Sequence, residues 1–157
     1  MNQFKIEYDI SDTSIAKFSL MGAINENFNF EDYEKIFQPI IQIDLEKVTS
    51  INSCGLRDLI NFLKNFENKK IIYYNCPKIF IGQLNRVKGI LPENSKVLSF
   101  YAPYYSSNLD KEIDIKVFST EIVNGKAPQK TDPETGEELV FDENESIYFR
   151  FLTSKDL

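Results

Sequence analysis

A strand pattern and a helix pattern lie on either side of a short polar junction, and this pairing constrains the fold more than any other feature. Residues 40–45, IIQIDL, are mostly apolar and β-branched, which predicts a central strand. Beyond the junction, the side chains at the spacing of an amphipathic helix are Leu56, Leu59, Ile60 and Leu63. A buried strand followed by a helix indicates an α/β sheet with helices packed on it.

The same alternation continues on both sides of the junction. Strands are predicted at residues 4–8, 15–20, 69–74 and 97–105, with Gly22 ending the second of them. Helices are predicted at residues 30–37 and after Pro77, the latter ending near Gly89. We therefore expect residues 1–108 to form an α/β domain with a mixed β-sheet.

Residues 109–157 follow a different pattern. Strand-like stretches at 113–118, 139–141 and 147–152, separated by turn sequences, predict a small antiparallel β extension, essentially an acidic β-hairpin. In the turn at residues 130–137, Asp132 and Thr135 stand where a zinc ribbon has thiolates, so we interpret it as a ribbon-like hairpin without metal. The aromatic residues 99–107 are expected either to be buried by this extension or to form an exposed patch for a partner.

Charge is distributed unevenly between these two parts. Residues 1–108 hold 12 acidic and 12 basic side chains, whereas residues 109–157 hold 12 acidic and 6 basic ones, which accounts for the net charge of −6. An acidic surface repels phosphates, so neither a nucleic acid nor an anionic membrane is expected as a partner. No apolar stretch approaches the roughly 20 residues of a membrane span, and residues 1–10 do not have the pattern of a signal peptide.

The amino-acid content also restricts the chemistry. The chain has no His, which removes Ser-His and Cys-His nucleophiles and the commonest metal ligand. No phosphate-binding glycine motif is present. Two cysteines, Cys54 and Cys76, are too few for a disulfide framework. We therefore predict a cytoplasmic, non-enzymatic protein without cofactor or metal.

The junction itself, Asn52-Ser53-Cys54-Gly55, begins the helix. The first amides of a helix have no partner within it, and Asn52 or Ser53 can cap them. Gly55 lacks a Cβ and so permits close approach of another backbone. Because the helix dipole adds partial positive charge here, the site can bind a partner's carboxylate, a phosphoryl group or another anion. The alternative is an ordinary helix cap without a ligand.

The stretch "IQIDLEKV" followed by "TSINSCGLRDLINFL" resembles the central segment of STAS domains, the sulfate-transporter and anti-sigma-factor-antagonist family. In that family the strand leads to D-S-[ST]-G-[LI] at a helix start, and here the stretch reads Asn52-Ser53-Cys54-Gly55-Leu56. The order of strands and helices over residues 4–105 is similar as well. The resemblance implies a bacterial-type signalling module that switches partners by docking onto a regulatory kinase or another signalling protein.

Two residues depart from the family pattern. Cys54 stands where the family has its phosphoacceptor, and Asn52 stands where it has Asp. We therefore predict protein binding without the usual phospho-switch, with Ser53 as the remaining hydroxyl that a kinase can modify. Cys54 is expected either to fill the space of a Ser or to be a thiol with a lowered pKa at the helix start. Cys76 is expected to be inert.

The predicted binding residues are Asn52, Ser53, Cys54, Gly55, Arg57 and Asp58. The first four form the loop, and the last two are the polar positions of the first helical turn. We expect Gly55→Arg to abolish partner binding while leaving the fold mostly intact. Two other functions stay open: a small-ligand sensor that binds a nucleotide or another anion at the same helix start, and a structural protein that assembles with itself, for instance as a homodimer.

Overall fold

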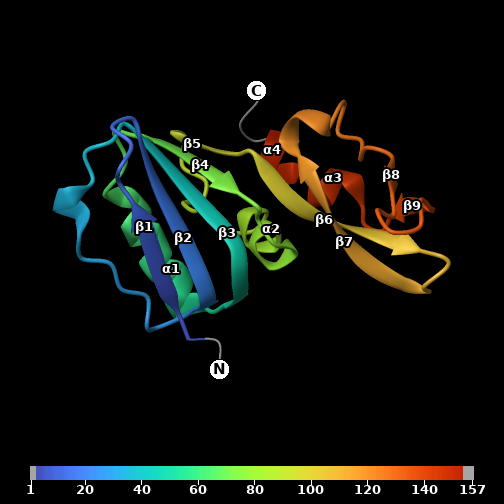
Figure 1. Cartoon of the computed structure of the whole chain (residues 1–157), viewed down its shortest axis with the longest axis horizontal. Helices are drawn as coiled ribbons and strands as arrows, with labels where there is room; N and C mark the ends of the chain where they lie inside the picture. The colour runs from blue at the N-terminus through green and yellow to red at the C-terminus, as the bar shows by residue number, and fades with distance from the viewer. Residues whose placement is uncertain (1–2, 154–157) are drawn as a thin grey trace.

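The structure, a computed structural model, describes residues 3–153. Within them the chain is an α/β protein with one mixed and one antiparallel sheet (Figure 1). The mixed sheet has the order β1-β2-β3-β4-β5, in which β1 is antiparallel to β2 and the other neighbours are parallel. Its strands are β1 (Lys5–Asp9), β2 (Ile15–Ile24), β3 (Ile40–Ile51), β4 (Lys70–Tyr74) and β5 (Ser95–Val97). The predicted α/β class, with a mixed sheet and an antiparallel part, is therefore confirmed.

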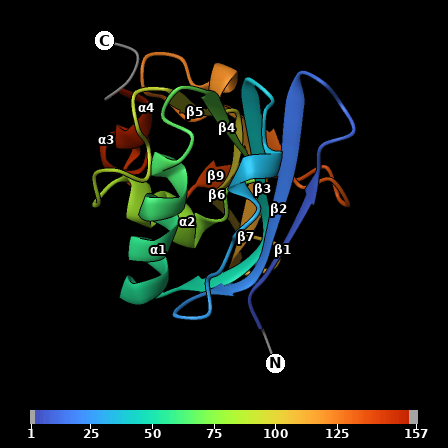
Figure 2. The ribbon, with the colours of Figure 1, turned by 90° about the vertical axis from the view of Figure 1, so that its left-hand side faces the viewer.

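Two helices cover one face of the mixed sheet. They are α1 (Ser53–Lys64), after β3, and α2 (Lys78–Leu84), after β4, and Figure 2 shows both on the same side of the strands. Phe18, Ile43 and Tyr73 lie side by side in β2, β3 and β4, and all three are buried. The rings of Phe18 and Tyr73 contact Phe62 of α1 and Phe80 of α2, at 5.5 and 5.2 Å between centroids. No helix within residues 3–153 is long and apolar enough to cross a membrane.

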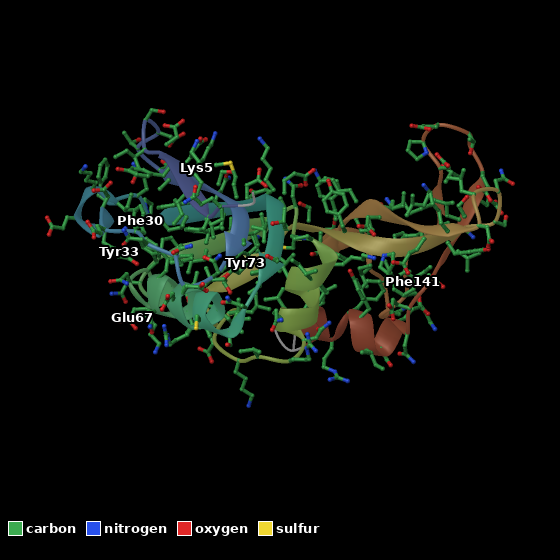
Figure 3. All side chains as sticks on the ribbon, turned by 90° about the horizontal axis from the view of Figure 1, so that it is seen from below. Lys5, Phe30, Tyr33, Glu67, Tyr73 and Phe141 are labelled. Carbon is green, nitrogen blue, oxygen red and sulfur yellow. The ribbon has the colours of Figure 1, made fainter. Side chains whose placement is uncertain are left out.

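The segment between β2 and β3 does not form the helix predicted at residues 30–37. Only Tyr33–Lys35 make a single 3-10 turn. The aromatic side chains instead pack one by one on α1: Phe30 and Tyr33 lie 5.4 and 5.8 Å from Phe62 between ring centroids. Figure 3 shows Phe30 and Tyr33 on the side of the sheet where α1 lies. The helix prediction was wrong because these tertiary contacts outweigh the local helical pattern.

Gly22 bends β2 rather than ending it. The strand continues to Ile24, and its pairing with β3 shifts register before and after Gly22. Gly22 has a φ of 78°, a left-handed conformation that glycine adopts without strain and that is common at bulges. The prediction that Gly22 ends the strand was therefore wrong, and β2 continues as far as the start of α1.

The antiparallel sheet has the order β7-β6-β9-β8. Its strands are β6 (Ser99–Ser106), β7 (Lys111–Phe118), β8 (Lys130–Thr131) and β9 (Glu138–Phe141). This sheet begins at Ser99, directly after the mixed sheet, so the expected division between residues 108 and 109 falls inside the β6–β7 hairpin. Phe100 and Tyr104 of β6 are buried, in agreement with burial of the aromatic stretch.

Residues 147–152 lie in two short helices and the turn at Phe149 between them, rather than in the predicted strand. These helices are α3 (Glu145–Tyr148) and α4 (Arg150–Thr153). Phe149 and Phe151 are buried, with ring centroids 6.1 and 5.2 Å from that of Phe100. The strand prediction was wrong because apolar and aromatic residues indicate that a segment is buried, but not which secondary structure it has. Short helical turns packed on β6 bury these side chains as well as a strand would.

Helix α2 connects the two sheets at its first turn. It begins where predicted but ends at Leu84, before Gly89. Lys78 forms ion pairs with two carboxylates of β7, those of Glu112 and Asp114. All three side chains are partly exposed, so these pairs orient the sheets more than they stabilise them.

The end of α2 is joined to the C-terminal helices by one amide side chain. Asn85 donates from Nδ2 to the carbonyl oxygen of Tyr148 at 2.9 Å. Its Oδ1 accepts the main-chain N–H of Phe151 at 2.8 Å. Asn85 thereby satisfies two main-chain groups at the junction of α3 and α4 and holds these helices against α2.

A second polar contact joins the two turns of the antiparallel sheet. The carboxylate of Glu137, before β9, accepts the hydroxyls of Ser106 and Ser107 at 2.7 and 2.8 Å and the N–H of Asn108 at 3.0 Å. These hydrogen bonds, the Asn108 amide foremost, lower the pKa of Glu137. Glu137 therefore stabilises the fold as a carboxylate and not as an acid.

We predict that Glu137→Gln lowers the melting temperature at pH 7 and that this difference disappears in acid. Because the pKa of Glu137 is lower in the folded chain than in the unfolded one, its contribution is present above the unfolded pKa of about 4.3 and is lost as the pH falls through the folded value. Thermal unfolding at several pH values between about 7 and about 2 measures the difference. Glu134→Gln, an exposed change in the same turn, is the control, and a difference that persists undiminished in acid would contradict the prediction.

Candidate functional site

The junction between β3 and α1 has the predicted cap. Asn52 is the N-cap of α1, with Oδ1 accepting the N–H of Gly55 at 2.8 Å. The N–H of Asn52 donates to the carbonyl oxygen of Ile24 at the end of β2 at 3.0 Å, and its Nδ2 donates to Glu26 Oε2 at 3.0 Å. Asn52 thus joins the start of α1 to the end of β2 and to the loop that follows it.

Gly55 is buried against the end of β2. A Cβ at this position would lie well inside van der Waals distance of the main-chain carbonyl of Ile24 and the main-chain nitrogen of Asn25. Both neighbours are backbone, so no rotation of a side chain can relieve the overlap. The expectation that Gly55→Arg leaves the fold mostly intact is therefore wrong, because any side chain at residue 55 pushes α1 away from β2.

The two residues between the cap and Gly55 leave main-chain donors available. Ser53 is exposed and Cys54 is half-buried. Asn52 satisfies the N–H groups of Gly55 and Leu56, whereas those of Ser53 and Cys54 make no hydrogen bond within the part of the chain that the structure describes. The start of this 12-residue helix therefore presents two free donors together with the partial positive charge of the dipole.

Arg57 and Asp58, the polar positions of the first turn, are paired with each other. The distance from Arg57 Nε to Asp58 Oδ1 is 3.2 Å, and the Arg57 side chain is 68% exposed. An ion pair this exposed contributes at most about 1 kcal/mol. The Arg57 guanidinium can therefore turn from Asp58 to a partner's carbonyl oxygen at small cost.

A carboxylate lies at the edge of the site. The hydrogen bond from Asn52 is the main cause that lowers the pKa of Glu26, so Glu26 is ionised at neutral pH. Its negative charge opposes the binding of a free anion at the start of α1. The electrostatics of the loop therefore suit the neutral oxygens of a protein partner better than a phosphate.

The two cysteines have different environments. Cys54 is half-buried in the first turn of α1, and Cys76 is fully buried between β4 and α2. Burial raises the pKa of the Cys76 thiol well above its usual value, which suppresses the reactive thiolate. The main chain of Cys76 bonds to β6 on both sides, donating to Ser99 O at 3.2 Å and accepting from Tyr101 N at 2.9 Å. The main chain of Cys76 therefore links the mixed sheet to the first strand of the antiparallel sheet.

The ribbon-like turn uses its polar side chains within itself. Asp132 accepts the N–H of Glu134 at 2.8 Å, and Thr135 Oγ1 accepts the N–H of Glu137 at 3.3 Å. Within residues 3–153 no group of three or more His, Cys, Asp or Glu side chains is arranged to hold a metal ion. The side chains of Asp132 and Thr135 therefore stabilise the turn through hydrogen bonds to its own main chain.

Sequence reasoning did not find a groove of about 680 Å³ that adjoins the predicted loop. Residues 49–51 at the end of β3 line it, together with Ile79 of α2, Arg86 just after α2, and Ile147 of α3. Ile79 and Ile147 are 41% and 54% exposed, and both line the same groove, so they place apolar surface from two helices side by side. No local sequence pattern brings three such distant segments together.

Comparison of the chain with protein-family models and with curated proteins finds no match. The observed order β1-β2-β3-α1-β4-α2 is the predicted one, apart from the absent helix between β2 and β3. The strand predicted at residues 97–105 is β6 of the antiparallel sheet, and the fifth strand of the mixed sheet is instead β5, which was not predicted. The resemblance of residues 52–56 to a known family therefore stays a prediction from the sequence.

We predict opposite effects of alanine at two helical glycines. Gly55→Ala should destabilise the fold by about 2 kcal/mol, because its Cβ overlaps the backbone of β2. Gly82→Ala in α2 should stabilise it by roughly 0.5–1 kcal/mol, because alanine favours helix. The nearest heavy atom to a Cβ at residue 82 is an Arg86 guanidinium nitrogen at 3.6 Å, an ordinary contact. Urea unfolding measures both free energies, and equal effects at the two positions would contradict the packing described for Gly55.

We also predict that at most one thiol per chain reacts promptly with Ellman's reagent in the native protein, because Cys76 is fully buried. The native Cys54→Ser variant should show no prompt reaction and should release one equivalent after addition of guanidinium. Prompt reaction of native Cys54→Ser would show that the interface between β4 and α2 opens readily.

Proposed function

We propose that the protein is a STAS-like, non-enzymatic protein-binding module of cytoplasmic, bacterial-type signalling, in which the start of α1 docks onto a regulatory kinase or another signalling protein. The observation that carries the proposal is the exposed cap of α1, with free N–H groups at Ser53 and Cys54. Asn52 and Gly55 fix this cap to β2, so the donors have fixed positions. Pre-positioned donors bind a partner without the entropy cost of ordering a loop.

The proposed module lacks the phospho-switch of the family it resembles. Cys54 occupies the position of the phosphoacceptor, and no Ser/Thr kinase can modify a thiol in its place. Ser53 is exposed, one residue earlier, and is the alternative site of modification. Mass spectrometry of protein purified from its native host distinguishes the two cases, because a phosphopeptide that contains Ser53 would restore the switch.

A sensor of nucleotides or other anions is the less favoured function at the same helix start. The ionised Glu26 beside Asn52 opposes an anion there. A partner that offers carbonyl and hydroxyl oxygens meets the same free donors without this repulsion. A protein partner is therefore the better match to the charge around the loop.

We predict that Ser53→Arg abolishes capture of the partner while the fold is kept. The side chain of Ser53 is exposed, so a larger residue fits without internal overlap, and a cation at a helix start costs only about 0.3–1 kcal/mol. The measurement is affinity purification from the native host with quantitative mass spectrometry, alongside the melting temperature.

The matched control is Glu67→Arg, an equally exposed change beyond the other end of α1 (Figure 3). Proteins that the wild type and Glu67→Arg capture should fall by about tenfold or more with Ser53→Arg, as for a central interface residue. Equal recovery with all three baits would contradict docking at the start of α1.

A further inference from the structure

We infer that the groove beside the last half of β3 binds an extended peptide segment of the partner, which adds to the free edge of β3 as a further strand. This inference rests on the proposed function, since it describes how a partner docked at the start of α1 continues across the molecule. Strand addition requires a free strand edge, room for the added backbone, and side-chain pockets that select the sequence.

The free edge exists because β3 is longer than β4. Pairing of β3 with β4 covers only residues 40–44, whereas β3 continues to Ile51 with β2 as its partner on the other side. Figure 1 shows α2 beside this last half of β3, past the end of β4. A helix cannot complete the hydrogen bonds of a strand edge, so the ladder is interrupted there.

The polar groups of Ile51 point toward the groove. Ile51 is paired with Ile24 of β2, and the next residue, Asn52, donates its N–H to Ile24 O. In a parallel ladder this pattern means that the residues flanking Ile51 bond to Ile24, while the N–H and C=O of Ile51 face the opposite edge. One donor and one acceptor are therefore presented to the groove, as the next strand of a sheet requires.

The walls of the groove supply the selecting side chains. Its volume is about 680 Å³, within the range of pockets that enclose a ligand of a few residues' size. The exposed Ile79 of α2 and Ile147 of α3 stand on the walls and favour an apolar side chain on the peptide. An apolar pair on the walls and polar main-chain groups at the base match a β-strand better than a nucleotide or a sugar.

Charge identifies a second feature of the peptide. Arg86 lines the groove and forms no ion pair within residues 3–153, its Nε donating only to the carbonyl oxygen of Gly82 at 3.1 Å. Lys78, the other cation of the groove, is already paired with Glu112 and Asp114. Glu143 also lines the groove, but it forms no ion pair with Arg86. An acidic residue of the peptide can therefore pair with Arg86, so the expected ligand is an extended segment with one acid, placed at Arg86, and one apolar residue.

The position of the groove links it to the proposed docking site. Ile51 is followed directly by Asn52 and Ser53, so the edge of β3 runs into the cap of α1. A partner that grips the free N–H groups of the cap is therefore placed to lay a strand along β3. The two contacts use different atoms and can be separated by substitution.

The experiment selects short random peptides displayed on phage against the full-length protein and measures binding of the selected peptides by fluorescence anisotropy. Groove variants are Ile79→Asp, Ile147→Asp and Arg86→Ala, and the control is Val140→Asp, a change at a 67% exposed apolar residue of β9. Affinity should fall by about tenfold or more with each groove variant and stay unchanged with the control. Amide exchange of Ile51 should slow when peptide is added.

Other outcomes would overturn the inference. These are failure to select peptides above background, selected peptides whose affinity ignores all groove variants, and unchanged exchange at Ile51. Peptide binding that only Ser53→Arg abolishes would support docking at the helix start while rejecting strand addition. A dimer detected by light scattering and dissociated by Ile147→Asp would make a second copy of the chain the occupant, and not a partner's peptide.

Discussion

The contact between the start of α1 and the end of β2 is the constraint on which the rest of the site depends. Gly55 lets the helix backbone lie directly on the carbonyl of Ile24, and the N–H of Asn52 donates to that same carbonyl. The bulge at Gly22 carries β2 far enough to meet the helix. Because these contacts fix the inner side of the helix start, Ser53 lies on the outer side. The exposed N–H donors on which the proposed docking depends are therefore a result of packing.

The fold was predictable where local pattern and tertiary packing agree. The spacing of Leu59 and Leu63 predicted the inner face of α1, and both are buried. The helix prediction at residues 30–37 failed because the aromatic rings of this segment pack at separate positions in the core. An extended backbone places the rings at those positions better than a helix does. The strand prediction at residues 147–152 failed for a related reason, since short helical turns bury the same apolar and aromatic side chains that a strand would bury.

The candidate site was likewise predictable from the sequence only in part. Asn52 was predictable as a cap because capping depends on residues three apart in sequence. The role of Gly55 was misjudged, because sequence shows that a Cβ is absent but not which backbone fills its place. The groove was not predictable at all: its lining comes from β3, α2 and α3, and only the early end of β4 exposes the edge of β3.

The side chain of Asn85 has a consequence for the rate at which the proposed peptide would enter the groove. By bonding to both Tyr148 and Phe151, it holds the end of α2 against the C-terminal helices, and α2 and α3 each form a wall of the groove. The proposed peptide would then bind without a prior opening of the groove, so diffusion and orientation would set its association rate. Differences in affinity among peptide sequences would lie mainly in the dissociation rate. Selectivity among such peptides would therefore be a difference in residence time.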